Sequence, residues 1–401
     1  MATDKTNPKI LHVSTIAVTL SKFIAPIAQQ LREMGCRVDA AASEISENQG
    51  CAQAFDHCHS IPFERKFLSK ANLTVAMRTI RELADSEAYD LVHVHTPIAS
   101  FVTRRALRNR KPDQKLVYTA HGFHFFDGAS WLRNKLFATL EKSASKWMDH
   151  LIVINRQDQR NALKLGLATE QSLTYMSGIG IDLAKFQVPP NASEIRRKKL
   201  QELGIPQDSF VFLKVAGFTP NKKHCDAVRA FAKLPSDRRF DLLFAGDGTM
   251  RQETLQLAEQ LGVADRVHFL GYRNDIKELV TTCDTMMLVS GREGLPCSVM
   301  EGMALGKTFV GTNIRGTSDL LADRVGLLVP AGAPDELARA MIESQTFQPN
   351  SEKLAERLQQ CSLENIVEQH VQLYQQLLNW TPSRQVSHRS QAVTTLSLIH
   401  I

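Results

Sequence analysis

Two glutamates eight residues apart, Glu293 and Glu301, lie in the stretch SGREGLPCSVMEGMALGK of residues 290–307. A Gly-Leu-Pro turn separates them, and the strand-like run TMMLVS precedes them. Because proline suits the first turn of a helix, the stretch predicts a strand end, a turn and a helix start. Both carboxylates could then accept hydrogen bonds from hydroxyl groups of one bound molecule. The alternative is exposed charge at both positions, the usual state of an isolated glutamate.

The backbone of this turn offers a second interaction. The amides of Gly294 and Leu295, with those around Cys297 and Ser298, are expected at a helix N-terminus, where backbone N–H groups have no partner within the helix. Such a terminus attracts phosphate, by about 0.3–1 kcal/mol per charge when it is exposed. The stretch therefore predicts a turn that faces phosphate.

Short apolar runs alternate with helical patterns along the chain, which predicts an α/β fold with parallel sheets covered on both faces. The pattern lapses near Pro189-Pro190-Asn191 and then starts again. We therefore expect two doubly wound domains, residues 1–188 and 189–362. A C-terminal helix over 363–380 is expected to pack back on the N-terminal domain. The tail 381–401 is expected to be disordered, and its last six residues, LSLIHI, resemble a translated sequencing adapter.

Composition narrows the class of protein. The 401 residues carry 48 Lys+Arg and 42 Asp+Glu, a net charge of +6. No recognised nucleic-acid-binding module or large charge excess is present, so nucleic acid is not an expected partner. Seven scattered cysteines without a CxxC pair indicate free thiols in a reducing compartment, and argue against a zinc site. The polar N-terminus and the lack of a long apolar run predict a cytoplasmic protein without a membrane span.

Several motifs together resemble the retaining glycosyltransferases of the GT-B fold, family 4. The signature EGLPCSVME followed by GMALGK is joined by further matching segments along nearly the whole chain up to about residue 380, namely VHVHTPIAS, YTAHGFHFF, IVINRQD, GIGIDLAKF, FAGDGTMR, HFLGYRNDI and NIRGTSDLL. The resemblance implies two Rossmann-like domains facing a central cleft. It also implies that the second domain binds a nucleotide sugar and the first an acceptor.

The resemblance assigns roles to individual residues. Glu301 matches the glutamate that holds the ribose hydroxyls, and Glu293 matches the one that contacts the donor sugar. His121 matches the histidine of a His-Gly motif beside the reaction centre, although it could also be a loop histidine that is merely hydrogen-bonded. Further donor-binding positions that the resemblance implies are Gly294, Leu295, Pro296, Arg292, Gly271 and Tyr272.

The diphosphate of such a donor needs positive charge. The sequence has no D-x-D, the usual anchor for a catalytic metal, so lysine, arginine and helix amides are expected to take the metal's electrostatic role. In VAGFTPNKKH, Lys222 matches the family lysine, but Gly217 stands where the family has an arginine. Lys223 and Arg315, with Arg292, are candidate substitutes. No metal and no cofactor beyond the nucleotide sugar, by family habit a UDP-sugar, are expected.

The acceptor implied by the resemblance is a polyprenyl-diphosphate-linked sugar at the cytoplasmic face of a membrane. The basic run RRALRNRKPDQK fits an anionic lipid surface, and the following HFFDGASWLRNKLFATLEK could form an interfacial helix. The equally weighted alternative is a solvated face beside a core helix. The candidate membrane contacts are Arg104, Arg105, Arg108, Phe125 and Trp131.

Other functions stay open at this point. A soluble acceptor, a UDP-sugar 2-epimerase on the same fold and a non-catalytic nucleotide-sugar-binding subunit are the alternatives. The Glu-x7-Glu match argues against the epimerase, and Gly217 is the one hint of a non-catalytic subunit. A Rossmann dehydrogenase does not fit, because the loop after the first strand reads STIAVTLSK and contains no G-x-G-x-x-G.

Overall fold

The computed structural model describes residues 7–64, 66, 69–126 and 128–382. Its contacts divide the chain into two compact units, each built around its own parallel sheet. The first unit runs to Gly180 and includes the C-terminal segment from Leu363, and the second unit is Ile181–Ser362. Of the tail 381–401 that was expected to be disordered, residues 383–401 lie outside the described residues.

The first unit contains a seven-stranded sheet with the order β3-β2-β1-β4-β5-β6-β7, in which every neighbouring pair is parallel. Strand order reverses at β1, as in doubly wound sheets. The strands are β1 (Lys9–Ile16), β2 (Arg37–Ser43), β3 (Cys58–Ser60), β4 (Leu91–His95), β5 (Lys115–Ala120), β6 (His150–Val153) and β7 (Leu173–Tyr175).

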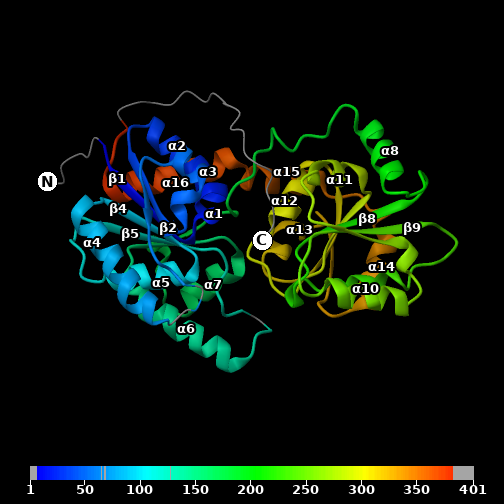
Figure 1. Cartoon of the computed structure of the whole chain (residues 1–401), viewed down its shortest axis with the longest axis horizontal. Coiled ribbons are helices and arrows are strands. Elements are labelled where there is room, and N and C mark those ends of the chain that lie inside the picture. The colour runs from blue at the N-terminus through cyan, green and yellow to red at the C-terminus, as the bar shows by residue number, and fades with distance from the viewer. Residues whose placement is uncertain (1–6, 65, 67–68, 127, 383–401) are drawn as a thin grey trace. The chain divides into compact units, whose positions relative to one another are not determined.

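Helices cover both faces of this sheet (Figure 1). One apolar cluster joins the sheet to the helices α1 (Ala17–Thr19), α2 (Ala25–Glu33), α3 (Gln49–Ala54) and α16 (Leu363–Leu378). Another joins the opposite face to α4 (Met77–Glu87), α5 (Pro97–Ala106), α6 (Trp131–Ser145) and α7 (Arg156–Lys164). The near-continuous apolar strands of the sequence are therefore buried on both sides.

The second unit repeats this plan with six parallel strands in the order β10-β9-β8-β11-β12-β13. The strands are β8 (Phe210–Val215), β9 (Phe240–Ala245), β10 (Val267–Gly271), β11 (Thr285–Leu288), β12 (Thr308–Thr312) and β13 (Leu327–Val329). The helices are α8 (Ala192–Glu202), α9 (His224–Phe231), α10 (Arg251–Gln260), α11 (Ile276–Thr282), α12 (Cys297–Ala304), α13 (Thr317–Leu321), α14 (Pro334–Glu343) and α15 (Ser351–Gln360). The predicted doubly wound α/β class is confirmed for both units.

Helix α16 belongs to the first unit although it follows the second in sequence. It packs beside α2 (Figure 1), and its buried side chains include Ile366, Val371 and Tyr374. The hydroxyl of Tyr374 is hydrogen-bonded to His93 Nδ1 on β4. The last helix thus completes the core on one face of the first sheet.

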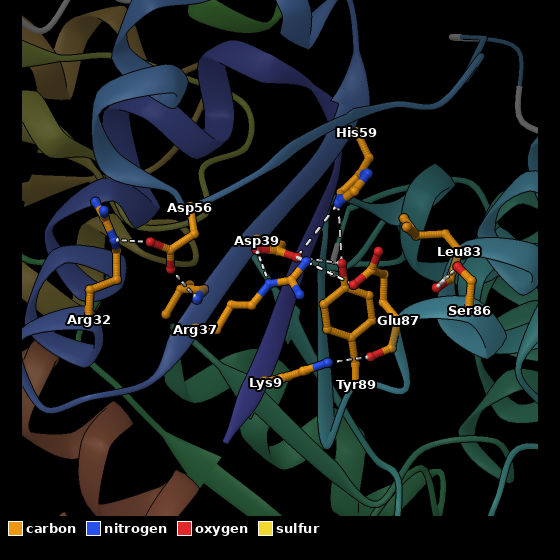
Figure 2. Close-up of polar contacts among 11 residues, drawn as sticks. Lys9, Arg32, Arg37, Asp39, Asp56, His59, Leu83, Ser86, Glu87 and Tyr89 are labelled. Atoms are coloured by element: carbon orange, nitrogen blue, oxygen red, sulfur yellow. Dashed lines mark hydrogen bonds and ion pairs between the residues drawn. The ribbon is translucent and has the colours of Figure 1, made fainter. Parts of the chain in front are cut away.

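A buried carboxylate, Asp39, organises polar side chains near the amino ends of the first sheet (Figure 2). Arg37 donates to it over 2.7 and 3.2 Å, and the Tyr89 hydroxyl donates over 2.7 Å. His59 Nε2 lies 3.6 Å from the same carboxylate. Burial alone would raise the pKa of Asp39, but His59, Arg37 and Tyr89 outweigh it and lower that pKa to about 2. The carboxylate is therefore ionised and paired at neutral pH.

The second unit has the same arrangement at the equivalent strands. Buried Asp241 on β9 accepts from Ser209 Oγ at 2.6 Å and from Arg239 Nε at 3.3 Å, and His268 Nε2 on β10 lies 2.8 Å away. In each unit the arginine precedes the aspartate by two residues. In the strand register, the histidine lies opposite the residue two positions after the aspartate, as Ala41↔His59 and Leu243↔His268 show. The amino edges of both sheets are thus closed by one kind of ion-paired network.

Candidate functional site

The loop between β11 and α12 lies at the carboxyl edge of the second sheet, where parallel α/β folds bind ligands. Helix α12 begins at Cys297, directly after Pro296, and no side chain caps its N-terminus. Gly294, Leu295 and Pro296 therefore lead into a helix end whose backbone N–H groups can receive an anion. Gly316 packs against this loop so closely that a Cβ there would lie 2.1 Å from the carbonyl oxygen of Gly294.

Glu301 is buried within α12, with 2% of its surface exposed. Its Oε1 atom has no hydrogen-bond partner among the described residues. Burial raises the pKa of Glu301 to about 8, and the charge of Lys185 opposes this only in part. An unsatisfied buried polar atom costs about 1–3 kcal/mol of folding stability. A ligand hydroxyl group that donated to Oε1 would remove this cost. The alternative of a solvated glutamate is wrong for Glu301.

Glu293 is held in the loop before α12 by a lysine and an arginine. Lys222 Nζ donates to its two carboxylate oxygens over 2.8 and 3.0 Å. Arg315 Nε donates to the backbone carbonyl of Glu293 over 2.9 Å. The Glu293 side chain is 10% exposed and that of Lys222 is 26% exposed, so the pair is reachable at the rim of the site.

The loops that follow β8, β11 and β12 therefore meet around Glu293 in the second unit. Asn221 joins the loop after β8 to the loop after β11. Its side-chain amide donates to the Arg292 carbonyl over 2.9 Å, and its own carbonyl accepts from Gly291 N over 2.8 Å. The structure thus brings together the predicted residues Glu293, Gly294, Lys222, Arg292 and Arg315. Lys223 follows in the same loop and is exposed.

The predicted residues Gly271 and Tyr272 lie at the end of β10, on the same carboxyl edge. Gly271 has a φ of 66°, and its carbonyl accepts from Gly246 N over 2.8 Å. Tyr272 is 51% exposed. In the sheet, β9 lies between their strand, β10, and β8.

Lys214 is a residue that the sequence analysis missed. It is fully buried in β8, and its Nζ donates to the Val289 carbonyl over 2.8 Å. Burial, together with the nearby positive charge of Lys222, lowers its pKa to about 7, although Glu293 and Asp226 oppose the shift. The signal was a single lysine inside the apolar strand FVFLKVAG, since lysine is almost never fully buried.

In the first unit, His121 lies directly after β5, beside a cluster of histidines. The cluster also includes His12 at β1 and His93 and His95 at β4, and register places His12 opposite His93. His12, His93 and His95 each offer a nitrogen within 4.8 Å of the others, the one group in the described part of the chain that could share a metal ion. His95 and His121 also line a small hollow with Thr119, Gly178, Ile179, Phe23, Ile24, Ile27, Ile152 and His370.

Two of the candidate membrane contacts are wrong. Arg104 is fully buried, where it donates to Glu141 Oε2 over 2.7 Å and lies 4.3 Å from the centre of the Tyr118 ring. Phe125 is buried as well, stacked on Phe123. Arg104 is buried because α5 packs against β4, β5 and α6, and Phe125 belongs to the apolar cluster on the same face of the sheet, which the basic run alone does not reveal.

The other candidates are at the surface. Arg105 and Arg108 are exposed at the end of α5. On α6, Trp131 is 68% exposed, and its ring lies 4.8 Å from Lys135 Nζ. Leu132 and Leu136, one helical turn apart, are 72% and 56% exposed. None of the helices in the described residues has the length and apolarity to cross a bilayer.

Comparisons with known proteins match both units. Residues 20–173 match the family model "Glycosyltransferase Family 4", and residues 195–361 match "Glycosyl transferases group 1". The putative glycosyltransferase EpsD of Bacillus subtilis is 34% identical over 339 residues, which cover 82% of this chain and 86% of EpsD.

Two further proteins are similar. The UDP-Gal:alpha-D-GlcNAc-diphosphoundecaprenol alpha-1,3-galactosyltransferase of Escherichia coli is 26% identical over 66% of this chain and 68% of its own. The crystal structure of Anabaena Alr3699/HepE in complex with UDP and glucose superposes with a TM-score of 0.74. It covers 92% of this chain and 100% of that one at 21% identity, which supports a shared fold.

Replacing Glu301 with glutamine tests its burial. With a pKa of 4.5 unfolded and about 8 folded, the carboxyl is protonated in both states at low pH, and only the unfolded state loses its proton as pH rises. The wild type should therefore lose stability between pH 5 and pH 8 relative to Glu301→Gln, by at most about 5 kcal/mol. Urea unfolding followed by circular dichroism at several pH values measures this difference.

The exposed Glu259 on α10 provides the matched control. Glu259→Gln should follow the wild type at every pH. A constant offset between Glu301→Gln and the wild type would contradict a raised pKa.

Proposed function

Because the chain belongs to the family 4-like glycosyltransferases of the GT-B fold, we propose that it moves a hexose or N-acetylhexosamine from a UDP-sugar to a polyprenyl-diphosphate-linked sugar. The observation that carries the donor half is the buried, unpartnered Glu301 oxygen beside an uncapped helix N-terminus. The acceptor half is supported by the E. coli relative, which by its name takes UDP-Gal and a diphosphoundecaprenol-linked sugar.

In this proposal the second unit binds the donor along α12. Glu301 accepts hydrogen bonds from the ribose hydroxyls through its buried Oε1, which has no partner among the described residues. The amides at the start of α12 bind the diphosphate, which the positive end of the helix favours. Glu293 accepts from the sugar hydroxyls, with Gly271 and Tyr272 flanking the donor on the same edge.

Positive charge at the diphosphate comes from the protein in this proposal, without a metal ion. Lys222 is placed for this task, since it lies between β8 and α9 and its Nζ is ion-paired with Glu293, in the loop that leads into α12. Lys223 and Arg315 are adjacent. Fixed cations of this kind stabilise the charge that builds up on a departing diphosphate.

The proposed chemistry retains the configuration at the anomeric carbon. The acceptor hydroxyl attacks that carbon from the face that the diphosphate leaves, the bond to the diphosphate oxygen breaks, and that oxygen takes the hydroxyl proton. No strong protein base is required. Glu293 is already ion-paired with Lys222, which suits a sugar-binding role better than a covalent nucleophile.

The acceptor is proposed to reach the first unit from an anionic membrane. Trp131, Leu132 and Leu136 supply exposed apolar surface, and Lys135, with Arg105 and Arg108 at the end of α5, supplies positive charge. Each lysine or arginine near an anionic surface contributes about 1 kcal/mol. The protein would then be peripheral to the membrane.

The transfer reaction is tested with a panel of nucleotide sugars and a polyprenyl-diphosphate-linked sugar, with products identified by mass spectrometry. We expect transfer from a UDP-sugar that persists in EDTA, with about a 100-fold loss of kcat in Glu293→Gln and retained UDP binding. The exposed Glu259→Gln serves as the control. Binding of UDP without transfer from any sugar would favour a non-catalytic subunit. Release of an epimerised sugar would favour the epimerase. Transfer only to soluble acceptors would overturn the proposal of a lipid-linked acceptor.

Gly217 provides a second test, since the family resemblance places an arginine there. A Cβ built at Gly217 meets only the Asp247 carbonyl oxygen, at 3.4 Å, which is ordinary contact. Gly217→Arg should therefore fold and tighten UDP binding about tenfold, the value of one charge-assisted hydrogen bond. Isothermal titration calorimetry measures the affinity. Gly217→Met controls for size without charge, and an equal gain in both variants would contradict an electrostatic cause.

Membrane contact is tested with the double variant Leu132→Ser/Leu136→Ser. Removing two exposed leucines should weaken co-sedimentation with phosphatidylglycerol vesicles at least about tenfold, because each loses its buried apolar area in the lipid interface. Leu261→Ser, at an exposed leucine of the second unit, should bind as the wild type does. Equal binding of all three proteins would rule out this face of α6.

A further inference from the structure

Three imidazoles in the first unit form a hydrogen-bonded chain that ends at His121. His12 Nδ1 lies 3.1 Å from His95 Nε2, and His95 Nδ1 lies 3.4 Å from His121 Nε2. His95 therefore uses both of its ring nitrogens within the chain. The rings of His12 and His95 are nearly parallel, at 16° with centroids 5.4 Å apart.

Burial favours the neutral form of all three rings. Burial lowers the pKa of His12 to about 3 and that of His121 to about 4, and it lowers the pKa of His95 well below its ordinary value. A neutral imidazole carries one N–H donor and one acceptor nitrogen. Each of the two hydrogen bonds in the chain must therefore have one protonated and one unprotonated nitrogen.

The end of the chain at His12 selects its direction. His12 Nε2 is buried and has no hydrogen-bond partner within the described ranges. If the proton were on Nε2, a buried N–H would have no acceptor, and orphaned buried N–H groups are rare in proteins. With the proton on Nδ1, His12 donates to His95 and only a lone pair is left unpaired.

The neighbouring histidines do not offer another direction. His93 uses both ring nitrogens elsewhere, with the Tyr374 hydroxyl and with Thr119 Oγ1 at 2.7 Å. His370 Nδ1 lies 2.8 Å from the Ile366 carbonyl oxygen, to which it can only donate. Of the three residues close enough to share a metal ion, His93 already has both nitrogens bonded, so the contacts favour a hydrogen-bonded chain over a metal site.

We propose that His12 and His95 are positioning residues that fix His121 in the tautomer protonated on Nδ1. His12 donates to His95 Nε2, so the His95 proton lies on Nδ1 and is donated to His121 Nε2. The remaining nitrogen of His121, Nδ1, then carries a proton. His121 meets a ligand as a hydrogen-bond donor to a hydroxyl or charged oxygen, and not as a base.

This inference rests on the proposed function, with His121 beside the reaction centre as the family resemblance implies, and it deepens that function. A donor at this position agrees with a reaction in which the leaving diphosphate takes the acceptor's proton. It also assigns a role to buried His12 and His95, which the resemblance leaves unassigned.

Two-bond 1H–15N correlation spectra of histidine-labelled protein test the tautomer without any substrate. The His121 signals are identified by their absence in His121→Gln. We expect Nδ1 of His121 to be protonated and Nε2 unprotonated at pH 7. Protonation on Nε2 would overturn the proposal whether or not the protein transfers sugar, so the two proposals fail separately.

Variants of the hydrogen-bonded histidines provide the second readout. His95→Leu removes the donor to His121, and we expect His121 to lose its single tautomer and kcat to fall about tenfold with little change in donor KM. His95→Asn keeps an amide N–H near the place of Nδ1 and should recover most of the loss. If His95→Leu leaves the His121 signals unchanged, the chain does not set the tautomer.

His150 supplies the control, since it is a buried histidine of the same sheet that bonds to Thr174 Oγ1 at 2.8 Å outside the chain. His150→Leu should leave the His121 signals as they are. Elemental analysis of the purified protein completes the test. One equivalent of a transition metal that is lost in His93→Gln would show that these imidazoles are ligands, and would overturn the hydrogen-bonded chain.

Discussion

The rule that a buried polar group must find a hydrogen-bond partner is the constraint on which the polar residues of both sheets depend. At the amino edges the rule is met: Asp39 and Asp241 are both buried, and both are surrounded by donors. It is not met at Glu301 in α12 or at His12 in the middle of β1, each of which has a buried atom without a partner among the described residues. In the proposed function, the unpartnered oxygen of Glu301 is satisfied by hydroxyl groups of the donor.

The two units share more than a strand order. Both place an arginine, an aspartate and a histidine at matching register positions on the equivalent pair of strands. Their carboxyl edges differ, because the first unit presents imidazoles and the second presents carboxylates and lysines. Neutral imidazoles tolerate burial in an apolar sheet, whereas the charged pair of Lys222 and Glu293 stays partly open to water.

Much of the fold followed from sequence because apolar runs bounded by turn residues are read reliably as strands. The apolar runs ILHVS, RVDAAA, LVHVH, KLVYTA, HLIVI and LTYM predict strands, and they overlap β1, β2, β4, β5, β6 and β7 of the first sheet. The short edge strand Cys58–Ser60 was missed, since three residues of mixed polarity carry no periodic signal. At the site, the Glu-x7-Glu spacing identified the loop and the helix together.

What sequence did not supply was burial and partner choice. Arg104 lies in a basic run, yet it is buried because Glu141 on α6 and the Tyr118 ring are in reach. The chain of histidines depends on register between β1, β4 and β5, which no local pattern encodes. Lys214 is the instructive miss, because an ionisable residue inside an apolar run is visible without a structure.

The place of α16 in the first unit has a consequence for how the protein is made. This helix supplies Tyr374 and His370 to the histidine-bearing face of the first sheet, but the ribosome synthesises it after the entire second unit. Until then, the apolar side chains that α16 covers have no partner from this helix, and joining them requires closing a loop that spans residues 181–362. Contacts so distant in sequence slow folding. The second unit can therefore fold before α16 packs on the first unit. The nascent first unit is the species that would most need protection from aggregation.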